Sequence, residues 1–290
     1  MPRAKVLVAL WIFVAVAAAF SGASALNYTA RVVAFGPRPP GSEAHRKLQN
    51  YILTELRRFR CEVVEDAFTA QTPLGPIPMK NIVARFAGIS GKAVAITGHY
   101  DTKSLPGLRF VGANDGGSSA GFLLEMARTL SARPRRHDIY LIWFDGEEAI
   151  VQWSETDSLY GSRHLVRRWR QDGTIERLTA LINVDMIGDK ELAIVREAHS
   201  TLWLRERIWQ IAAELGYQRH FRNEVVEIED DHVPFLRAGV PAVNLIDFDY
   251  GPGHSWWHTE QDTLDKLSPR SFQVVGDVVL EFIRRWETER

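Results

Sequence analysis

The stretch LIWFDGEEAIVQWSETDSLYGSRHL, residues 141–165, places three carboxylates within four residues, directly after an apolar run. The run is rich in β-branched and aromatic residues, which is typical of a buried strand. Carboxylates this close repel one another, and burial near a strand end makes their charge costly. A bound metal ion would supply the compensating positive charge. The stretch therefore predicts a strand that ends at a metal site.

Similar apolar runs occur along the chain and alternate with helical patterns. Strand-like runs cover residues 81–86, 93–101, 139–145, 178–188 and 242–249. Helical spacing of apolar residues is found in 42–60, 118–130, 200–215 and 271–286. This alternation predicts a single α/β domain, with a mainly parallel or mixed central sheet flanked by helices on both faces. Ligands of such sheets bind outside the carboxyl ends of the strands.

The N-terminal segment has a different character from the rest of the chain. Two basic residues precede an uncharged apolar run from Val6 to Phe20, and Ala23-Ser24-Ala25 gives the small-x-small pattern of a signal peptidase site. We therefore predict a signal peptide over residues 1–25, a catalytic domain over residues 26–290, and a secreted or periplasmic location. An uncleaved membrane anchor is the alternative, because the apolar run is near the lower length limit of a spanning helix.

Charge and cysteine content exclude several kinds of site. The formal net charge is −1 and the sequence contains no basic tract, which argues against a nucleic-acid partner. Cys61 is the only cysteine, so an intrachain disulfide and a thiolate zinc site are both excluded. Any zinc must be held by His, Asp and Glu side chains.

Five segments concentrate histidine and carboxylate at strand ends or in loops. They are GHYDT (98–102), GANDGGSSAG (112–121), FDGEEA (144–149), NVDMIG (183–188) and SWWHTEQD (255–262). Each segment alone has a simpler explanation; Asp115, for example, could cap the helix that follows it. Five such segments in one α/β domain are hard to explain by capping, and together they predict one site.

The order of these residues resembles the zinc-dependent aminopeptidases. The residues that carry this resemblance are His99, Asp115, Glu147, Glu148, Asp185 and His258. The amino-acid sequence of residues 144–165 and of EDDHVPFLRAGVP (229–241) resembles that of a related group, the glutaminyl-peptide cyclotransferases of the animal secretory type. The resemblance extends from about residue 81 to the C-terminus.

The resemblance implies a metal centre and a proton-transferring residue. The implied zinc ligands are Asp115, Glu148 and His258. Three oxygen and nitrogen ligands suit zinc and leave one position open, as a catalytic site requires. Glu147 would transfer the proton. The aminopeptidases bind a second zinc through His99 and Asp185, whereas the cyclases keep both residues and use one zinc.

Three other places favour the cyclases. The link after the paired glutamates is longer than in typical aminopeptidases and carries Trp153, which the resemblance places in the wall of the substrate pocket. Trp257, directly before His258, matches as well, although a buried core aromatic is the alternative explanation. Asp230 stands where the cyclases have an acid in the active site. Glu229 departs from the animal pattern, in which an amide is usual.

These features predict a zinc-dependent acyltransferase that converts the N-terminal glutamine of peptides or proteins to pyroglutamate and releases ammonia. Glu147 would shuttle the proton, and Asp185 and Asp230 would orient this proton relay. One zinc ion per chain would polarise the γ-carboxamide. The substrate would bind between Trp153 and Trp257.

Two other functions remain open at this point. One is a di-zinc aminopeptidase that hydrolyses N-terminal residues from peptides, which the metal content of the protein would distinguish. The other is a binding or scaffold domain without activity, against which the complete ligand set argues. We expect a monomer, with no stable membrane partner unless the N-terminal segment stays uncleaved.

Overall fold

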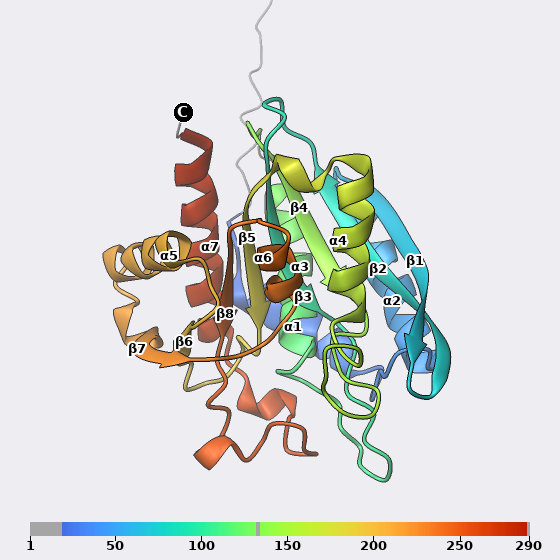
Figure 1. Cartoon of the computed structure of the whole chain (residues 1–290). Coiled ribbons are helices and arrows are strands. Elements are labelled where there is room, and N and C mark those ends of the chain that lie inside the picture. The colour runs from blue at the N-terminus through green and yellow to red at the C-terminus, as the bar shows by residue number, and fades with distance from the viewer. Residues whose placement is uncertain (1–18, 132–133, 289–290) are drawn as a thin grey trace, which may run out of the picture.

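A six-stranded sheet runs through the centre of the molecule (Figure 1). The computed structural model describes residues 19–131 and 134–288. The strands, in their spatial order, are β1 (Glu62–Thr72), β2 (Gly75–Phe86), β4 (Asp138–Phe144), β3 (Ala93–His99), β5 (Leu178–Asp185) and β8 (Ala242–Ile246). The last four are parallel to one another, while β2 runs antiparallel to both β1 and β4. The sheet is therefore mixed, with a parallel core.

Helices cover both faces of this sheet. One face packs against α1 (Gly22–Val33), α2 (Glu43–Leu56), α3 (Gly117–Leu130), α5 (Leu202–Glu214) and α7 (Pro269–Thr288). The opposite face, toward the viewer in Figure 1, packs against α4 (Tyr160–Asp172) and α6 (His232–Arg237). A small parallel pair, β6 (Ile194–Glu197) and β7 (Phe221–Val226), lies beside the main sheet. The predicted fold class is confirmed.

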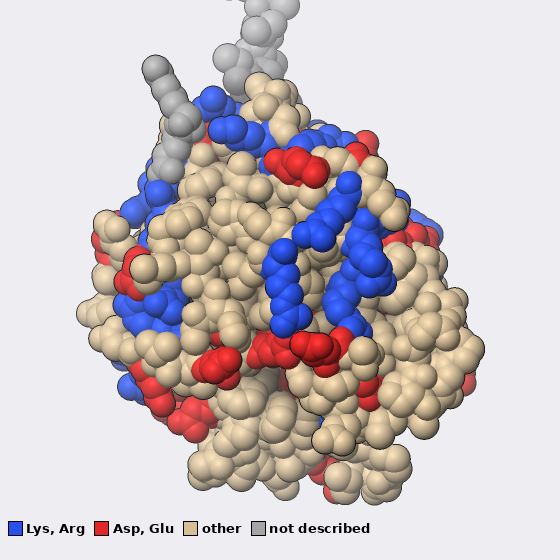
Figure 2. All heavy atoms as spheres, viewed as in Figure 1, with Lys and Arg blue, Asp and Glu red and all other residues tan. Residues whose placement is uncertain are grey.

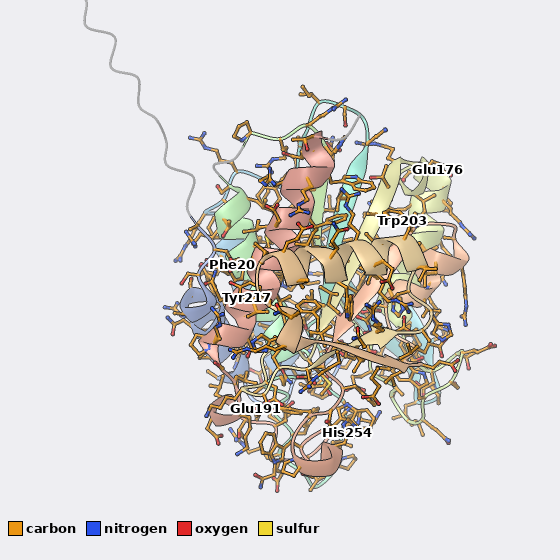
Figure 3. All side chains as sticks on the ribbon, turned by 90° about the vertical axis from the view of Figure 1, so that its left-hand side faces the viewer. Phe20, Glu176, Glu191, Trp203, Tyr217 and His254 are labelled. Atoms are coloured by element: carbon orange, nitrogen blue, oxygen red, sulfur yellow. The ribbon has the colours of Figure 1, made fainter. Side chains whose placement is uncertain are left out.

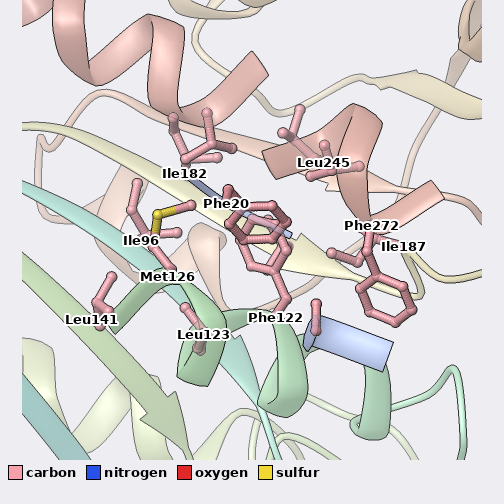
Figure 4. Close-up of a cluster of buried hydrophobic side chains, with 14 of the residues drawn as sticks. Phe20, Ile96, Phe122, Leu123, Met126, Leu141, Ile182, Ile187, Leu245 and Phe272 are labelled. Carbon is pink, nitrogen blue, oxygen red and sulfur yellow. The ribbon is translucent and has the colours of Figure 1, made fainter. Parts of the chain in front are cut away.

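The strands divide their side chains between two hydrophobic clusters because successive residues of a strand point to opposite faces. In β3, Val94 and Ile96 belong to the larger cluster, while Ala93 and Ala95 belong to the smaller cluster under α4 and α6. Figure 4 shows part of the larger cluster, in which Ile96 lies among side chains of α3 and β5. Both faces of the parallel strands are buried, which explains their nearly continuous apolar runs.

The sequence analysis predicted only the second half of β2, residues 81–86, and missed β1 and the first half of β2. Residues 72–79, TPLGPIPM, form the turn between β1 and β2 and the beginning of β2. Pro76 and Pro78 are tolerated there because β2 pairs with β4 only from Ile82 onward, so these prolines face no second partner strand. The predicted helix after Ser42 is confirmed as α2, with the Ser42 hydroxyl accepting a hydrogen bond from the His45 backbone.

The residues just before α1 are part of the packed structure. Phe20 is buried with its ring 5.2 Å from that of Phe122, and the Ser21 backbone N–H donates to Glu125 Oε1 at 2.8 Å. The predicted leader boundary after Ala25 falls inside α1, where Ala25 is buried. Most of the predicted leader, residues 1–18, lies outside the described residues. Among the residues that are described, no helix is long and apolar enough to cross a membrane.

Candidate metal centre and active site

The five histidine and carboxylate segments meet at the carboxyl edge of the parallel strands. His99 is the last residue of β3, and Asp185 is the last residue of β5. Glu147 and Glu148 follow the end of β4 at a distance of a few residues. Asp115 precedes α3, and His258 comes from the loop after β8. Since β3, β4, β5 and β8 are parallel, their carboxyl ends lie at the same edge, as the sequence predicted.

Three predicted zinc ligands form one tight cluster. His258 Nε2 lies 2.9 Å from Glu148 Oε1 and 3.2 Å from Asp115 Oδ2. One ligand atom from each of these residues lies within 4.8 Å of the other two, so a single ion could contact all three. Asp115 and Glu148 are buried, and His258 is half-buried at the floor of a cavity.

A second cluster shares Asp115 with the first. His99 Nε2 lies 3.2 Å from Asp115 Oδ1 and 3.2 Å from Asp185 Oδ1, and the three residues satisfy the same distance criterion. Asp115 therefore faces one cluster with each carboxylate oxygen. The structure brings together all the residues that were predicted as ligands of a first or a second metal.

The donor set and its hydrogen bonding fit a bound zinc ion. Oxygen and imidazole nitrogen are common zinc ligands, and three of them leave an open position. Asp115 Oδ2 is fully buried and makes no hydrogen bond, although buried carboxylate oxygens are normally paired. A cation at Asp115, Glu148 and His258 would satisfy that oxygen.

The raised pKa values of His258 and His99 show that the surrounding carboxylates favour a positive charge at both clusters. Burial lowers the pKa of His258, but its contacts with Asp115 and Glu148 outweigh that effect and raise the pKa to about 9. For His99 the outcome is likewise a raised pKa, because three carboxylates oppose the effect of burial. In the absence of a metal these clusters attract protons, and a metal ion would displace those protons on binding.

Glu147 lies beside the zinc-ligand cluster and is also buried. Burial raises the pKa of Glu147 well above its usual range, and the charges of Glu148, Asp230 and Asp231 raise it further against the opposing effect of His99. A carboxyl group with a raised pKa can both give and accept a proton near neutral pH. This environment suits the predicted proton transfer.

The turn that carries the paired glutamates is fixed through its backbone. The Glu147 and Glu148 N–H groups donate to the two carboxylate oxygens of Asp101, at 3.2 and 3.3 Å. Gly146 has φ 63°, and a Cβ there would lie 2.5 Å from the Met79 sulfur, so only glycine fits. Asp101 therefore supports the glutamate turn, and its Oδ1 lies 3.5 Å from His99 Nδ1.

Asp115 is held in place by groups that the sequence did not reveal. It does not cap α3, because the N-cap residue is Gly116 and no side chain caps the helix; the capping interpretation is wrong. The backbone N–H of Asp115 donates to Asp262 Oδ2 at 3.1 Å. Arg38, fully buried, donates to the carbonyls of Val111 and Gly112 in the preceding loop.

A cavity of about 340 Å³ opens above the predicted metal ligands. Trp153 and Trp257 both line it, and the Trp257 ring stacks on that of His258 at a centroid distance of 3.9 Å. Figure 2 shows acidic side chains gathered where this face of the molecule is hollowed. Lys103, which the sequence analysis missed, also lines the cavity, with Nζ 3.5 Å from Glu148 Oε2.

The insertion that carries Trp153 is a defined loop. The Asp157 carboxylate accepts hydrogen bonds from the backbone of Ile150, Val151 and Gln152, each at 2.9 Å. It also accepts one from the Tyr160 hydroxyl at 2.7 Å. One buried carboxylate thus closes the loop and places its tryptophan at the cavity.

The segment EDDHVPF lies beside the insertion and contributes to the wall of the same cavity. Asp230 is buried and lines the cavity. His232 is fully buried, with Nε2 2.9 Å from Glu197 Oε2. Glu229, at the cavity mouth, accepts from the Trp153 indole at 3.4 Å and from Arg237 at 3.0 Å.

His254 takes no part in either cluster. Its ring packs against Phe248 and Trp257, and it belongs to neither of the groups within metal-binding distance. Figure 3 shows it in the loop at the lower end of the molecule. Tyr160 begins α4, so the insertion ends where that helix starts.

The sequence and the fold are both similar to those of known proteins. Residues 81–283 match peptidase family M28. The chain belongs to peptidase family M28. It is also 30% identical over 252 residues to the glutaminyl-peptide cyclotransferase of Drosophila melanogaster, covering 78% of this chain and 70% of that protein.

Solved structures agree with this assignment and add a bacterial relative. A glutaminyl cyclase from an Acidobacteriales bacterium is 40% identical, with a TM-score of 0.90 and 99% coverage of both chains. A zinc-dependent exopeptidase from Parabacteroides distasonis is 27% identical, with a TM-score of 0.82 over 94% of this chain and all of the other. Within the M28 family the chain groups with the glutaminyl cyclases. The chain is similar to both animal and bacterial cyclases, so its assignment to the animal secretory type stays a prediction.

Proposed function

We propose that this chain is a glutaminyl-peptide cyclotransferase that acts on peptides or proteins beginning with glutamine. The observation that carries the proposal is the cavity above Asp115, Glu148 and His258, walled by Trp153 from the insertion and by Trp257. The 40% identity to a bacterial glutaminyl cyclase supports it.

The reaction joins two ends of one substrate residue. The free α-amine of the glutamine attacks its own γ-carboxamide carbon, the bond to the amide nitrogen breaks, and that nitrogen leaves as ammonia. Zinc bound by Asp115, Glu148 and His258 would supply a Lewis acid for the γ-carbonyl oxygen. The remaining tasks are orientation and proton transfer, for which the chain's own side chains are available.

Glu147 is the proposed proton-transferring residue. It would take a proton from the attacking α-amine and deliver it to the departing nitrogen, so the carboxylate is regenerated. Its raised pKa supports this role. Asp185 and Asp230, both buried beside the cavity, are the proposed residues that orient this transfer. The aromatic walls would exclude water, which is a competing nucleophile.

A di-zinc aminopeptidase is the second candidate, because His99, Asp115 and Asp185 could hold another ion. We propose one zinc per chain for the cyclase, and two tightly bound zinc ions would count in favour of the peptidase. A domain without activity has less support, since the complete ligand set lies within metal-binding distances.

Product analysis separates these functions. The purified protein is incubated with a peptide that begins with glutamine, and peptide mass and free ammonia are followed together. Loss of one ammonia with the peptide bond intact is expected. A peptide beginning with asparagine is the matched control, because its shorter side chain would have to close a four-membered ring. Release of free glutamine would contradict the proposal and indicate a peptidase.

Export remains a proposal as well. The apolar run after Arg3 and Lys5 supports a leader. Cleavage after Ala25 would remove Phe20 and Ser21, which pack against the folded domain, so the cleavage position has to be measured. The N-terminal mass of the exported protein measures it. A new terminus at Leu26 would confirm the predicted boundary, and an unprocessed chain would support the membrane anchor.

A further inference from the structure

One side of helix α4 carries a stripe of arginine side chains. Arg163, Arg167 and Arg170 stand at positions i, i+4 and i+7, so they share one side of the helix. Arg237, the last residue of α6, lies beside this stripe, since its carbonyl accepts a hydrogen bond from the Arg170 guanidinium at 3.4 Å. We name these four residues the arginine face. Figure 2 shows basic side chains gathered on this side of the molecule.

Most of the positive charge on this face is not paired with a carboxylate of the chain. α4 contains four arginines and one acidic residue. Arg168, outside the stripe, pairs with Asp66 at 2.6 Å. Among the residues that the structure describes, no carboxylate pairs with Arg167 or Arg170, and both are exposed. Like charges four residues apart destabilise a helix, so the placement of Arg163 and Arg167 needs an explanation other than stability.

The arginine face begins at the rim of the active-site cavity. Arg163, one turn into α4, donates to the Glu155 carbonyl in the insertion that carries Trp153. Glu229 accepts from Trp153 Nε1 at 3.4 Å and from the Arg237 guanidinium at 3.0 Å. One side chain therefore separates Arg237 from the wall of the cavity.

The length of the face matches a short run of peptide. A helix rises about 1.5 Å per residue, so Arg163 and Arg170 lie roughly 10 Å apart along the axis of α4. An extended peptide advances about 3.3 Å per residue, so about three residues cover that distance. With glutamine in the cavity and about three residues crossing the rim, the residues from about position five to about position eight would lie on the face.

We propose that the arginine face binds acidic side chains of peptide substrates, at about positions five to eight counted from the N-terminal glutamine. The inference rests on the proposed function. Guanidinium groups bind carboxylates through paired hydrogen bonds, which suits the Glu and Asp side chains of a peptide. The rim carboxylates of Glu227 and Glu229 would repel acidic residues closer to the glutamine. Preferred substrates would therefore be neutral or basic just after the glutamine and acidic farther along.

A flexible peptide fits this face better than a broad anionic surface does. Figure 2 shows acidic side chains along the edge of the basic region, where the molecule is hollowed. A membrane or a nucleic acid lying across the face would also meet these carboxylates, which would repel it. The formal net charge of −1 adds no general attraction to polyanions.

A pair of peptides tests the proposal. Each begins with glutamine and three neutral residues and then carries either three glutamates or three lysines. For the wild type, kcat/KM should be about 5- to 20-fold higher for the glutamate peptide at low salt, since each exposed ion pair contributes modestly. This preference should disappear near about 1 M NaCl, where exposed charges are screened. Equal kcat/KM values for the two peptides at low salt would overturn the proposal.

Charge-removing variants locate the preference on the molecule. The double variant Arg167→Gln/Arg170→Gln should reduce it to about twofold or less. Arg57→Gln/Arg60→Gln is the matched control, because it removes the same charge from exposed residues just after α2, on the other face of the sheet. The control variant should keep the wild-type preference. An equal loss of preference in both variants would contradict the proposal, since only the total charge would then matter.

Direct binding separates this inference from the proposed reaction. Fluorescent peptides that begin with asparagine, and so do not cyclise, carry the same glutamates or lysines, and fluorescence anisotropy measures their Kd. Tighter binding of the glutamate peptide that Arg167→Gln/Arg170→Gln abolishes, in a chain that cyclises no glutamine peptide, would refute the proposed function but keep the peptide-binding face. Cyclisation with equal binding of both peptides would refute the face alone. Binding of phosphatidylserine vesicles through these arginines, with no preference between the peptides, would replace the peptide with a membrane.

Discussion

The floor and the rim of the active-site cavity are built in different ways. The floor consists of the potential metal ligands His99, Asp115, Glu148, Asp185 and His258, together with Glu147 beside them. The rim consists of Trp153, Glu227, Glu229 and Trp257. Floor residues follow the ends of parallel strands or lie in loops fixed by buried carboxylates, and Asp115 and Glu148 are each only 3% exposed. At the rim, by contrast, Trp153 is 37% exposed and the Glu227 side chain 78% exposed.

This difference separates the chemistry that the fold supplies from the specificity that the loops supply. A zinc-dependent exopeptidase and a glutaminyl cyclase both share this fold with the chain, at TM-scores of 0.82 and 0.90. Fold likeness therefore does not distinguish hydrolysis from cyclisation. The floor should control metal binding and proton transfer, and the rim should control how the substrate is held.

The largest effect is expected for His258→Ala at the floor. Removing one of three ligands should lower zinc affinity by more than the roughly 10- to 100-fold that loss of an outer partner costs. Zinc content measured after dialysis against a chelator checks this. His254→Ala is the matched control, since that residue lies four positions away in the same loop and outside both clusters. Full zinc content in His258→Ala would remove this residue from the ligand set.

Glu147→Gln should separate proton transfer from metal binding within the floor. Glutamine has nearly the same shape but cannot carry the proton, so kcat should fall about 100- to 10,000-fold, the usual share of general acid–base catalysis. Zinc content should stay at the wild-type value, because Glu147 belongs to neither potential metal cluster. Full turnover of glutamine peptides by this variant would exclude Glu147 from the mechanism.

The floor residues could be predicted from the sequence, whereas the residues that hold them in position could not. His99, Asp115 and Asp185 were found because each lies at the edge of a local strand or helix pattern. Their supports, such as Arg38 and Asp262, are remote in sequence: Asp262 accepts from the Asn114 backbone, 148 residues away. Spacing along the chain carries no sign of such a contact.

Helix α1 shows the same limit for the fold. Its first residues resemble the end of a leader in composition, so the sequence favoured a boundary at Ala25. The structure packs Gly22 so closely that a Cβ there would lie 1.9 Å from the Pro269 carbonyl oxygen. Only the folded arrangement of α1 against α7 reveals why a glycine stands at that position.

A third prediction concerns the buried pair Glu197 and His232, which lies behind the cavity wall formed by residues 229–235. Burial raises the pKa of Glu197, but the hydrogen bond and charge of His232 and several N–H donors outweigh it and lower the pKa to about 2. A carboxyl group with a lowered folded pKa stabilises the protein above its unfolded pKa, and this contribution is lost as the pH falls toward 2. Glu197→Gln should therefore cost about 1.5–3 kcal/mol near neutral pH.

Urea unfolding at pH 7 and pH 3 measures this contribution. The difference in unfolding free energy between wild type and Glu197→Gln should be larger at pH 7 than at pH 3. Glu224→Gln, an exposed carboxylate on β7, is the control and should change stability little at either pH. An equal difference at both pH values would mean that the charge of Glu197 does not stabilise this wall.

The smallest effect is expected for Trp153→Ala at the rim. Loss of one aromatic wall should raise KM for a glutamine peptide about 3- to 10-fold, in line with roughly 1 kcal/mol for an aromatic contact. kcat and zinc content should change little, because the floor stays intact. Trp203→Ala, which removes an exposed tryptophan of α5 labelled in Figure 3, is the control. A fall in kcat as large as that of Glu147→Gln would contradict the division between floor and rim, since the insertion would then take part in the chemistry itself.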